Sequence, residues 1–271
     1  MPSAQINGVQ LHYRIDGDGP PVVWLHGLLN SIERAHMIGE GMERLAQHGF
    51  RVVMYDARGH GESGYTDDQA HYTWQAHAHD MLGLLDHLGI ERAIIGGGSM
   101  GAGVSVTFAI AHPERVEALL LLIPPPLADT IGPAQQIFGG LASLIESQGV
   151  EQAANIVMQL SPYKEMEETE PERRELIRQW MLGIRPDSSV AAIRGLLLGS
   201  PLVAERFGEI AAPTLIIAHP EDPIHPLSTA DRLHEAIAGS RLVAAPRIDY
   251  YRDHQDELLT TAVGFLRGED D

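Results

Sequence analysis

The sequence predicts an α/β protein with a mostly parallel, eight-stranded sheet flanked by helices, and three observations support this. Short apolar runs recur along the 271-residue chain with helical stretches between them. No such run occurs from Pro124 to about Pro201, where amphipathic segments follow one another. Gly97-Gly98-Ser99-Met100-Gly101 stands between a strand-like run and a helical stretch. We therefore expect a sheet with an inserted helical segment.

The strand-like runs are continuous rather than alternating, which is typical of parallel strands buried on both faces. Asn7-Gly8 separates the first two runs, and this dipeptide favours a type I′ hairpin turn. An antiparallel hairpin is therefore expected at one edge of the sheet. The predicted strands are Ala4–Ile6, Val9–Ile15, Pro21–His26, Arg51–Tyr55, Arg92–Ile95, Val116–Ile123, Pro213–Ala218 and Arg241–Ala245.

The helical stretches outside the insertion are expected at Ser31–His48, Met100–Ala111 and Gln255–Arg267. Within the insertion, the stiff connector Pro124-Pro125-Pro126 precedes three amphipathic segments. Ligands of such folds bind at the carboxyl edge of the sheet, and we expect the insertion to cover that edge. The predicted division is a core of residues 1–125 and 202–271 with a helical cap of residues 126–201. The three segments are Gln135–Gln148, Val150–Leu160 and Glu170–Leu182.

Composition excludes several kinds of partner and site. The chain has 37 acidic and 19 basic residues, a net charge of -18, and no basic patch, so neither a nucleic acid nor an anionic membrane is expected as a partner. It has no cysteine, which removes disulfides and thiolate sites. No apolar run approaches the roughly 18 residues of a membrane span, and the first residues lack the pattern of a signal peptide. We expect a cytoplasmic protein.

Ser99 is the candidate nucleophile. It occupies the central position of a G-x-S-x-G motif that follows a strand and begins a helix. A serine in such a sharp, strained turn needs very small neighbours, because strand and helix must approach each other closely. Gly97 and Gly101 meet that need.

Other motifs resemble the α/β-hydrolase family, and the resemblance covers almost the whole chain outside the insertion. It implies the α/β-hydrolase fold, with an oxyanion hole formed by the backbone N–H groups of Leu28 and Met100. It also implies that His26 and His60 hold loops near the site by hydrogen bonds. The motifs are His26-Gly27-Leu28, Asp56-Ala57-Arg58-Gly59-His60-Gly61-Glu62-Ser63 and His112-Pro113-Glu114-Arg115-Val116.

Asp222 is the candidate acid that orients a catalytic base. It follows the strand Pro213–Ala218, and the chain order Ser, acid, His is the one expected for this fold. Its surroundings, Glu221-Asp222-Pro223-Ile224-His225-Pro226, are similar to the D-x-x-x-P turn of the family. Glu221 is the alternative acid, and a structural capping role for Asp222 is the other alternative.

The base is harder to place. The resemblance implies a histidine about four residues beyond the last strand, but Asp249 and Tyr250 stand there. His254 is the first histidine after that strand, and one hypothesis is that a rearranged loop brings it to Ser99 and Asp222.

A second hypothesis is that His254 faces solvent and the triad is incomplete. Tyr250 or Tyr251 would then donate a hydrogen bond where the histidine normally acts. His225 and His219, which lie on either side of the acid, are further candidates for the base.

The leading prediction is a hydrolase of an ester, lactone or related small carbonyl compound, acting through an acyl-Ser99 intermediate. C–C bond cleavage, perhydrolysis and lyase chemistry would use the same residues. The alternative from another class is a catalytically degenerate binding protein. The substrate is expected to be neutral and partly apolar. No cofactor fingerprint is present, no metal site is expected from His71, His77 and His79, and the oligomeric state is open.

Overall fold

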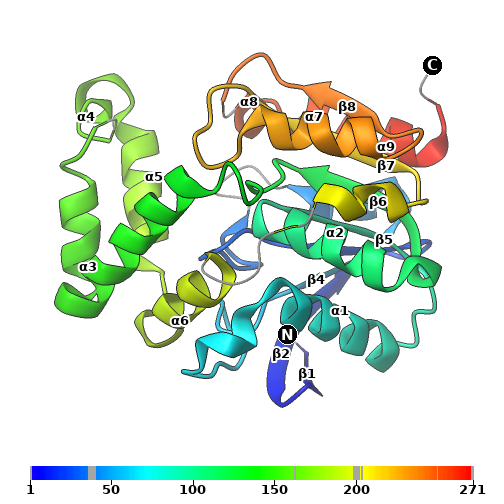
Figure 1. Ribbon diagram of the computed structural model, residues 1–271, viewed down its shortest axis with the longest axis horizontal. Helices are drawn as coiled ribbons and strands as arrows, with labels where there is room; N and C mark the ends of the chain where they lie inside the picture. The colour runs from blue at the N-terminus through cyan, green and yellow to red at the C-terminus, as the bar shows by residue number, and fades with distance from the viewer. Residues whose placement is uncertain are drawn as a thin grey trace.

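The computed structural model describes residues 2–35, 41–161, 163–197, 202, 204–248 and 250–269. Its strands form one sheet in the order β1-β2-β4-β3-β5-β6-β7-β8 (Figure 1). The β1–β2 and β2–β4 pairs are antiparallel and the other neighbours are parallel, which confirms the predicted mostly parallel, eight-stranded sheet. The strands are β1 (Ser3–Ile6), β2 (Val9–Asp16), β3 (Pro21–Leu25), β4 (Arg51–Tyr55), β5 (Ala93–Gly98), β6 (Val116–Leu122), β7 (Thr214–Ala218) and β8 (Arg241–Ala244).

The first two strands form the expected hairpin. Ile6 pairs with Val9 across the turn, and Asn7 and Gly8 both adopt positive φ, at 44° and 83°. Positive φ at both central residues is the requirement of a type I′ turn.

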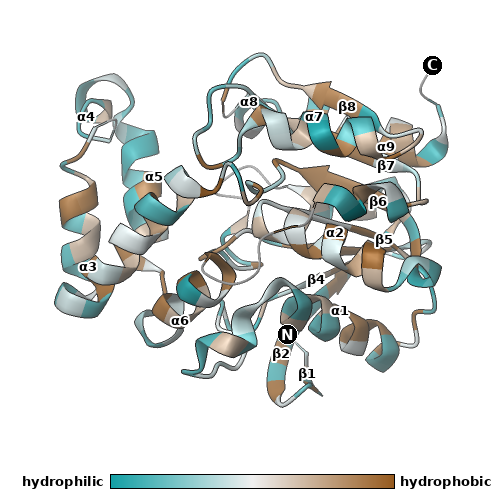
Figure 2. Cartoon of the chain, viewed as in Figure 1, coloured by the Kyte–Doolittle hydropathy of each residue, from teal (hydrophilic) through white to brown (hydrophobic). Residues whose placement is uncertain are grey.

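Helices cover both faces of the sheet. In β3, Val23 and Leu25 belong to the core on one face, while Val22 and Trp24 belong to the core on the other. Figure 2 shows hydrophobic strands beside helices of mixed hydropathy, such as α1 and α7. The first face is covered by α1 (Trp74–His87), α2 (Met100–Ala111) and α7 (Leu227–Ala236), and the second by η2 (Met42–His48) and α9 (Gln255–Arg267). Four short elements complete the framework: η3 (Gln69–Tyr72), η4 (Pro113–Arg115), η5 (Ala204–Glu209) and α8 (Tyr250–Asp253).

The helices α2 and α9 have the predicted limits, whereas the stretch Ser31–His48 differs from its prediction. One helical turn joins Ser31 to Ala35, residues 36–40 lie outside the described residues, and η2 is a 3-10 helix. It ends at Gly49, whose φ of 88° only glycine adopts readily. The glycine therefore stops the helix and directs the chain into β4.

The described residues between β6 and β7 form no strand. Figure 1 shows α3, α5 and α6 gathered to the left of the sheet. Gly149, with a φ of 82°, separates the two predicted segments that together make α3. The helices are α3 (Gly132–Val157), α4 (Met166–Thr169), α5 (Pro171–Leu182) and α6 (Pro186–Leu197). The division into a core and a cap at residues 125 and 202 stays a prediction.

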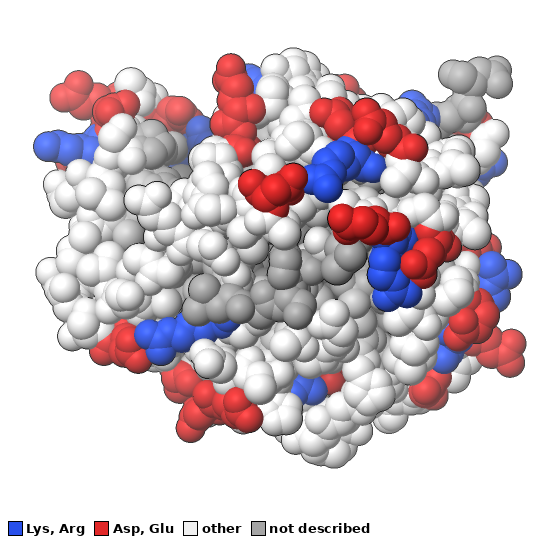
Figure 3. Space-filling model, in the orientation of Figure 1, with Lys and Arg blue, Asp and Glu red and all other residues white. Residues whose placement is uncertain are grey.

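Charges of both signs share the surface. On the face drawn in Figure 3, the Lys and Arg side chains of the described residues lie among Asp and Glu side chains and form no continuous basic patch. In the part of the chain that the structure describes, no helix is long and apolar enough to cross a membrane.

The strand order brings three loops to one edge of the sheet. β3 lies between β4 and β5, so chain connections diverge on either side of it, and ligands of open α/β sheets bind beside the carboxyl ends of strands at such a point. Leu28 follows β3, Ser99 follows β5 and Asp222 follows β7. This arrangement puts the candidate site residues at the same edge.

Candidate active site

Ser99 lies in the sharp turn between β5 and α2. Its φ of 52° and ψ of −109° are rarely adopted by residues other than glycine. A Cβ atom at Gly101 would lie only 1.9 Å from the carbonyl oxygen of Leu25, and one at Gly97 only 2.5 Å from it. The backbone N–H of Ser99 donates to the carbonyl of Leu122 at 2.9 Å. Close packing of β3 against the turn therefore explains both glycines of the motif.

The histidine that contacts Ser99 is His225. Its Nε2 atom lies 2.7 Å from Oγ of Ser99, and its Nδ1 atom lies 2.7 Å from Oδ2 of Asp222. A carboxylate only accepts hydrogen bonds, so Nδ1 carries the proton and Nε2 accepts from the serine hydroxyl. Ser99, His225 and Asp222 thus form a continuous hydrogen-bonded relay.

The turn after β7 holds the acid and the histidine together. Oδ1 of Asp222 accepts from the backbone N–H groups of Ile224, at 2.9 Å, and His225, at 3.2 Å. An aspartate that accepts from the amides two and three residues later closes a compact turn. The imidazole of His225 is thereby brought back to the other oxygen of the same carboxylate.

The surroundings keep Asp222 ionised. Burial acts to raise the pKa of this carboxyl, and the hydrogen bond with His225 acts to lower it. The Ile224 amide and His219 act in the same direction, so the pKa of Asp222 lies below its ordinary value. The side chains of Asp222 and His225 are only 7% and 12% exposed, which limits competition from water for their contact.

The other candidates beside the acid lie differently. Nε2 of His219 is 3.7 Å from Oδ2 of Asp222, and burial lowers the pKa of this imidazole more than Asp222 raises it. Glu221 is exposed and adopts a φ of 62°. Of the two carboxylates, Asp222 is the one that bonds the histidine at Ser99.

The expected contact between His254 and Ser99 is not formed, and this is a correction to the sequence analysis. His254 is exposed, and its Nδ1 group donates to the carbonyl of Tyr250 at 2.9 Å. Its ring stacks on that of Tyr250 with the centroids 4.0 Å apart. The residue precedes α9, and this local contact holds it at the surface.

The tyrosines do not replace a histidine. The Tyr250 hydroxyl donates to Glu257 at 2.8 Å, and Tyr251 packs in the core beneath α9. Asp249, the other residue at the position that the resemblance implied, lies outside the described residues. His225 was named only as a further candidate for the base, and the Asp-x-x-His spacing of Asp222 and His225 is the local signal for their mutual hydrogen bond.

Leu28 follows β3, Met100 follows Ser99, and β3 pairs with β5, the strand that ends just before Ser99. Met100 begins α2, where the first N–H groups have no acceptor within the helix and the helix dipole is positive. Leu28 is buried in the loop after β3, next to Leu29, whose φ is 62°. Both backbone N–H groups therefore belong to segments that approach the elbow.

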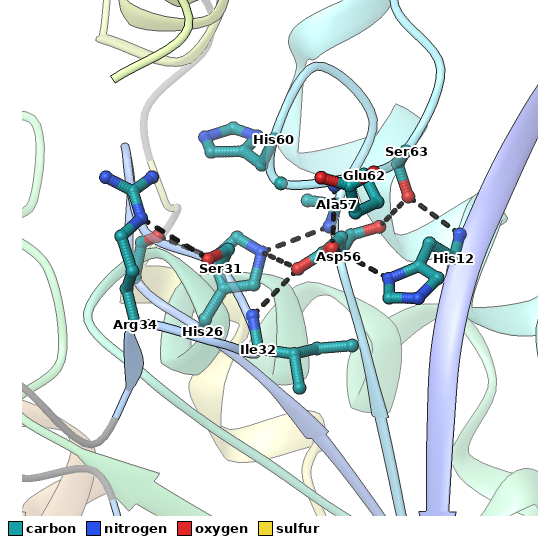
Figure 4. A network of polar contacts seen from close by, with 12 residues as sticks. His12, His26, Ser31, Ile32, Arg34, Asp56, Ala57, His60, Glu62 and Ser63 are labelled. Atoms are coloured by element: carbon teal, nitrogen blue, oxygen red, sulfur yellow. Dashed lines mark hydrogen bonds and ion pairs between the residues drawn. The ribbon is translucent and has the colours of Figure 1, made fainter. Parts of the chain in front are cut away.

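A buried network fixes the loop that carries Leu28 (Figure 4). The N–H of Ala57 donates to Nε2 of His26 at 3.1 Å, and the other ring nitrogen donates to Gly27 O at 2.7 Å. Oδ1 of Asp56 accepts from the N–H of Ile32 at 2.7 Å. These bonds tie the loop after β3 to the loop after β4, in agreement with the structural role expected for His26.

The second oxygen of Asp56 binds two further segments. Oδ2 of Asp56 faces Nδ1 of His12, at 3.0 Å, and accepts from the backbone N–H of Glu62, at 2.9 Å. Oγ of Ser63 donates to the backbone carbonyl of Asp56 and accepts from the N–H of His12. His60 donates from Nδ1 to the carbonyl of Arg58 at 2.9 Å, which is also a loop-holding bond.

Among the described residues, no group of three His, Cys, Asp or Glu side chains is arranged to hold a metal ion. The reactive groups that the structure assembles are a serine hydroxyl, an imidazole and a carboxylate.

Comparisons with known proteins agree on one fold. A family model described as "alpha/beta hydrolase fold" matches residues 20–247. The crystal structure of the enol-lactonase from Burkholderia xenovorans LB400 superposes with a TM-score of 0.80 and 27% identity, covering 98% of this chain and 100% of that one.

Two curated relatives match over different lengths. The 2-hydroxy-6-oxononadienedioate/2-hydroxy-6-oxononatrienedioate hydrolase of Paraburkholderia xenovorans (strain LB400) is 28% identical, over 95% of this chain and 91% of that protein. A putative non-heme haloperoxidase of Mycobacterium phage D29 is 45% identical over 39% of this chain. The chain spans only 36% of the length of that protein.

Proposed function

The chain belongs to the α/β-hydrolase fold family and is a hydrolase of it, and from this premise we propose that it cleaves small neutral esters or lactones through an acyl-Ser99 intermediate. The observation that carries the proposal is the relay from Ser99 through His225 to Asp222, with 2.7 Å at each contact. A serine hydroxyl becomes a useful nucleophile when a neighbouring base accepts its proton. His225 takes the role that the sequence analysis gave to His254.

In the acylation step, Nε2 of His225 accepts the proton of the Ser99 hydroxyl as Oγ attacks the substrate carbonyl carbon. Asp222 accepts the hydrogen bond from Nδ1 and stabilises the imidazolium that forms. The carbonyl oxygen becomes an oxyanion, and the backbone N–H groups of Met100 and Leu28 donate to it. When the bond to the leaving oxygen breaks, His225 returns the proton to that oxygen.

Deacylation follows the same path with water as the nucleophile. His225 removes a proton from the water, the hydroxide adds to the acyl carbon, and Oγ of Ser99 leaves and takes the proton back. An ester yields an acid and an alcohol. A lactone yields a hydroxy acid, since its acyl and leaving groups belong to one molecule.

The names of the relatives support carbonyl substrates, because a lactonase and a hydrolase of 2-hydroxy-6-oxo acids both act on compounds with a carbonyl group. The net charge of -18 favours neutral over anionic substrates at long range. A degenerate binding protein was suggested by the displaced histidine. The contact between His225 and Ser99 removes that reason.

The test is covalent labelling by a fluorophosphonate, followed by hydrolysis of a series of p-nitrophenyl esters and simple lactones. The chain has no cysteine, so thiols cannot compete for the label. We expect stoichiometric labelling of wild type and of Ser143→Ala, whose serine is exposed on α3, but none of Ser99→Ala. Hydrolysis of every ester and lactone at the same rate by wild type and Ser99→Ala would refute the proposal.

A further inference from the structure

A small, partly open cavity lies between the loops of the core and the helices of the insertion. The space in it that is open to the centre of a water molecule is about 10 Å³, which corresponds to one water. Its walls come from the loop after β3, the loop after β4 and the segment that contains α6. They are formed by Leu29, Asn30, Arg34, Gly59, His60, Gly61, Arg185 and Ser189.

Three side chains in these walls carry buried polar atoms without a protein partner among the described residues. They are Nδ2 and Oδ1 of Asn30, Nε2 of His60 and Oγ of Ser189. The three residues are 0%, 3% and 2% exposed, so bulk water does not solvate these atoms. An unpaired buried polar group costs about 1–3 kcal/mol, and four such atoms belong to three residues that line the same cavity, which indicates a shared ligand.

The arginines in the walls do not supply an anion site, because oxygen atoms of the protein already bind them. Arg34 donates to Trp180 O at 2.8 Å and to Leu29 O at 3.2 Å. Arg185 donates to the carbonyls of Gly61, at 3.2 Å, and Ser63, at 2.5 Å. The ligand is therefore recognised by the amide, the imidazole and the hydroxyl.

These three groups need a ligand that both donates and accepts hydrogen bonds. Nδ1 of His60 donates to Arg58 O, so Nε2 presents a lone pair. Burial, with His26 second, lowers the pKa of His60 to about 3, and the ring stays neutral at ordinary pH. The Asn30 amide offers one donor group and one acceptor, and the Ser189 hydroxyl offers both.

We propose that this cavity binds one ordered water, which hydrogen bonds to Asn30, His60 and Ser189 and joins α6 to the loop that carries Leu28. Water is the ligand of this volume that has two donors and two acceptors. Leu29, between Leu28 and Asn30, is held at a φ of 62°, so this loop needs strong restraint. The water makes Asn30 a positioning residue for the N–H of Leu28, and that part rests on the proposed function.

A crystal structure of the full-length wild type tests the water directly. We expect one peak within hydrogen-bond distance of the Asn30 amide, Nε2 of His60 and Oγ of Ser189. A direct hydrogen bond from Asn30 to His60 or Ser189, or an unhydrated cavity, would overturn the proposal. This readout does not depend on hydrolysis. A protein without esterase activity would refute the proposed function, and the crystal structure would still show whether the water is bound.

Kinetics with p-nitrophenyl acetate test the positioning. Leucine matches asparagine in size but makes no hydrogen bond, so we expect Asn30→Leu to lose the water and lower kcat about tenfold, with KM changed less than twofold. Such a split indicates an interaction made in the transition state. An unchanged kcat would refute the positioning role, and so would a rise in KM as large as the fall in kcat.

Adjacent serines provide a matched pair that avoids the loop itself. Ser189→Ala removes one ligand of the water, whereas Ser188→Ala removes a hydroxyl that donates to Gly59 O at 2.6 Å and does not line the cavity. We expect weaker water density and a lower kcat in Ser189→Ala. We expect Ser188→Ala to lower Tm while keeping the water and a kcat within twofold of wild type. Loss of the water in Ser188→Ala but not in Ser189→Ala would overturn the assignment of Ser189 as a ligand of the water.

Discussion

Oδ2 of Asp222 lies 2.7 Å from Nδ1 of His225, and the two residues belong to one turn of the chain. The same carboxylate accepts from the backbone N–H of His225 through its other oxygen, at 3.2 Å. The backbone N–H and the imidazole of His225 therefore both bond the carboxylate of Asp222. The distance between the candidate acid and base is set by local geometry rather than by packing between distant elements.

The relay predicts that hydrolysis depends on His225. Replacing His225 by alanine removes the acceptor of the Ser99 proton, so kcat/KM for p-nitrophenyl acetate should fall at least about 1,000-fold. Steady-state kinetics check this, with Tm measured alongside to show that the variant is folded. Asp222→Asn should also lower the rate strongly, because the amide would favour the wrong tautomer of the imidazole.

The matched controls are His254→Ala and Tyr250→Phe. His254 bonds Tyr250 and Tyr250 bonds Glu257, at the surface in both cases. Both variants should keep kcat/KM within about threefold of wild type, since surface substitutions away from the reacting groups change little. A large loss in His254→Ala beside a small one in His225→Ala would reverse the assignment of the base.

Gly101→Ala should destabilise the elbow. Its Cβ atom would meet Leu25 O at 1.9 Å, and relief requires β3 and α2 to separate. We expect a loss of about 3 kcal/mol or more in the free energy of unfolding, measured by urea denaturation. The control is Gly140→Ala in α3, where an added Cβ meets no atom within 4 Å and helix propensity favours a gain of about 0.5–1 kcal/mol. Equal effects at the two positions would contradict the close approach.

The buried pair of Arg58 and Asp80 predicts a non-additive effect on stability. The guanidinium donates twice to the carboxylate, at 2.6 Å each, and the side chains are 5% and 1% exposed. Arg58→Met alone leaves a buried negative charge and should cost about 3–5 kcal/mol. The double variant Arg58→Met/Asp80→Leu should cost less than the sum of the single variants, as a double-mutant cycle by urea denaturation will measure. Additivity would indicate that the pair does not interact in solution.

Acid should destabilise the protein below about pH 6.5, before the carboxylates titrate. Burial holds the pKa values of His26, His60 and His77 below their ordinary value, and that of His60 at about 3. As pH falls from about 6.5, the unfolded chain binds protons at these histidines and the folded chain does not. The free energy of unfolding should therefore decrease, by up to about 1.4 kcal/mol per pH unit for each histidine.

Urea midpoints between pH 7 and 4.5 measure this slope. His77→Met removes one of the three buried imidazoles and should reduce the slope by up to about 1.4 kcal/mol per pH unit. A midpoint that does not change across this range would show that these histidines take up protons in the folded state.

The strands and the elbow could be predicted because their signals are local. The apolar runs gave eight strands close to their observed limits, and Gly97 and Gly101 indicated the turn at Ser99. The stretch Ser31–His48 is helical only in part among its described residues, because Gly41 is not helical and η2 begins after it as a 3-10 helix.

The base was misplaced for a different reason. The family resemblance implied a histidine after the last strand, whereas the histidine that contacts Ser99 lies in the turn after β7. Which histidine points at Ser99 depends on how β5 and β7 are placed across β6, and that relation is tertiary. The bond between His225 and Asp222 could have been predicted from their spacing alone, but the bond between His225 and Ser99 could not.

The short connection between Asp222 and His225 also affects how the site responds to motion and to change. Asp222 and His225 lie in one loop, so a shift of that loop relative to β5 moves both together and preserves their mutual hydrogen bond. Only the contact with Ser99 must be restored when the loop settles. The alignment of the acid with the imidazole is therefore local, and the alignment of the imidazole with the serine depends on how the loop sits against β5.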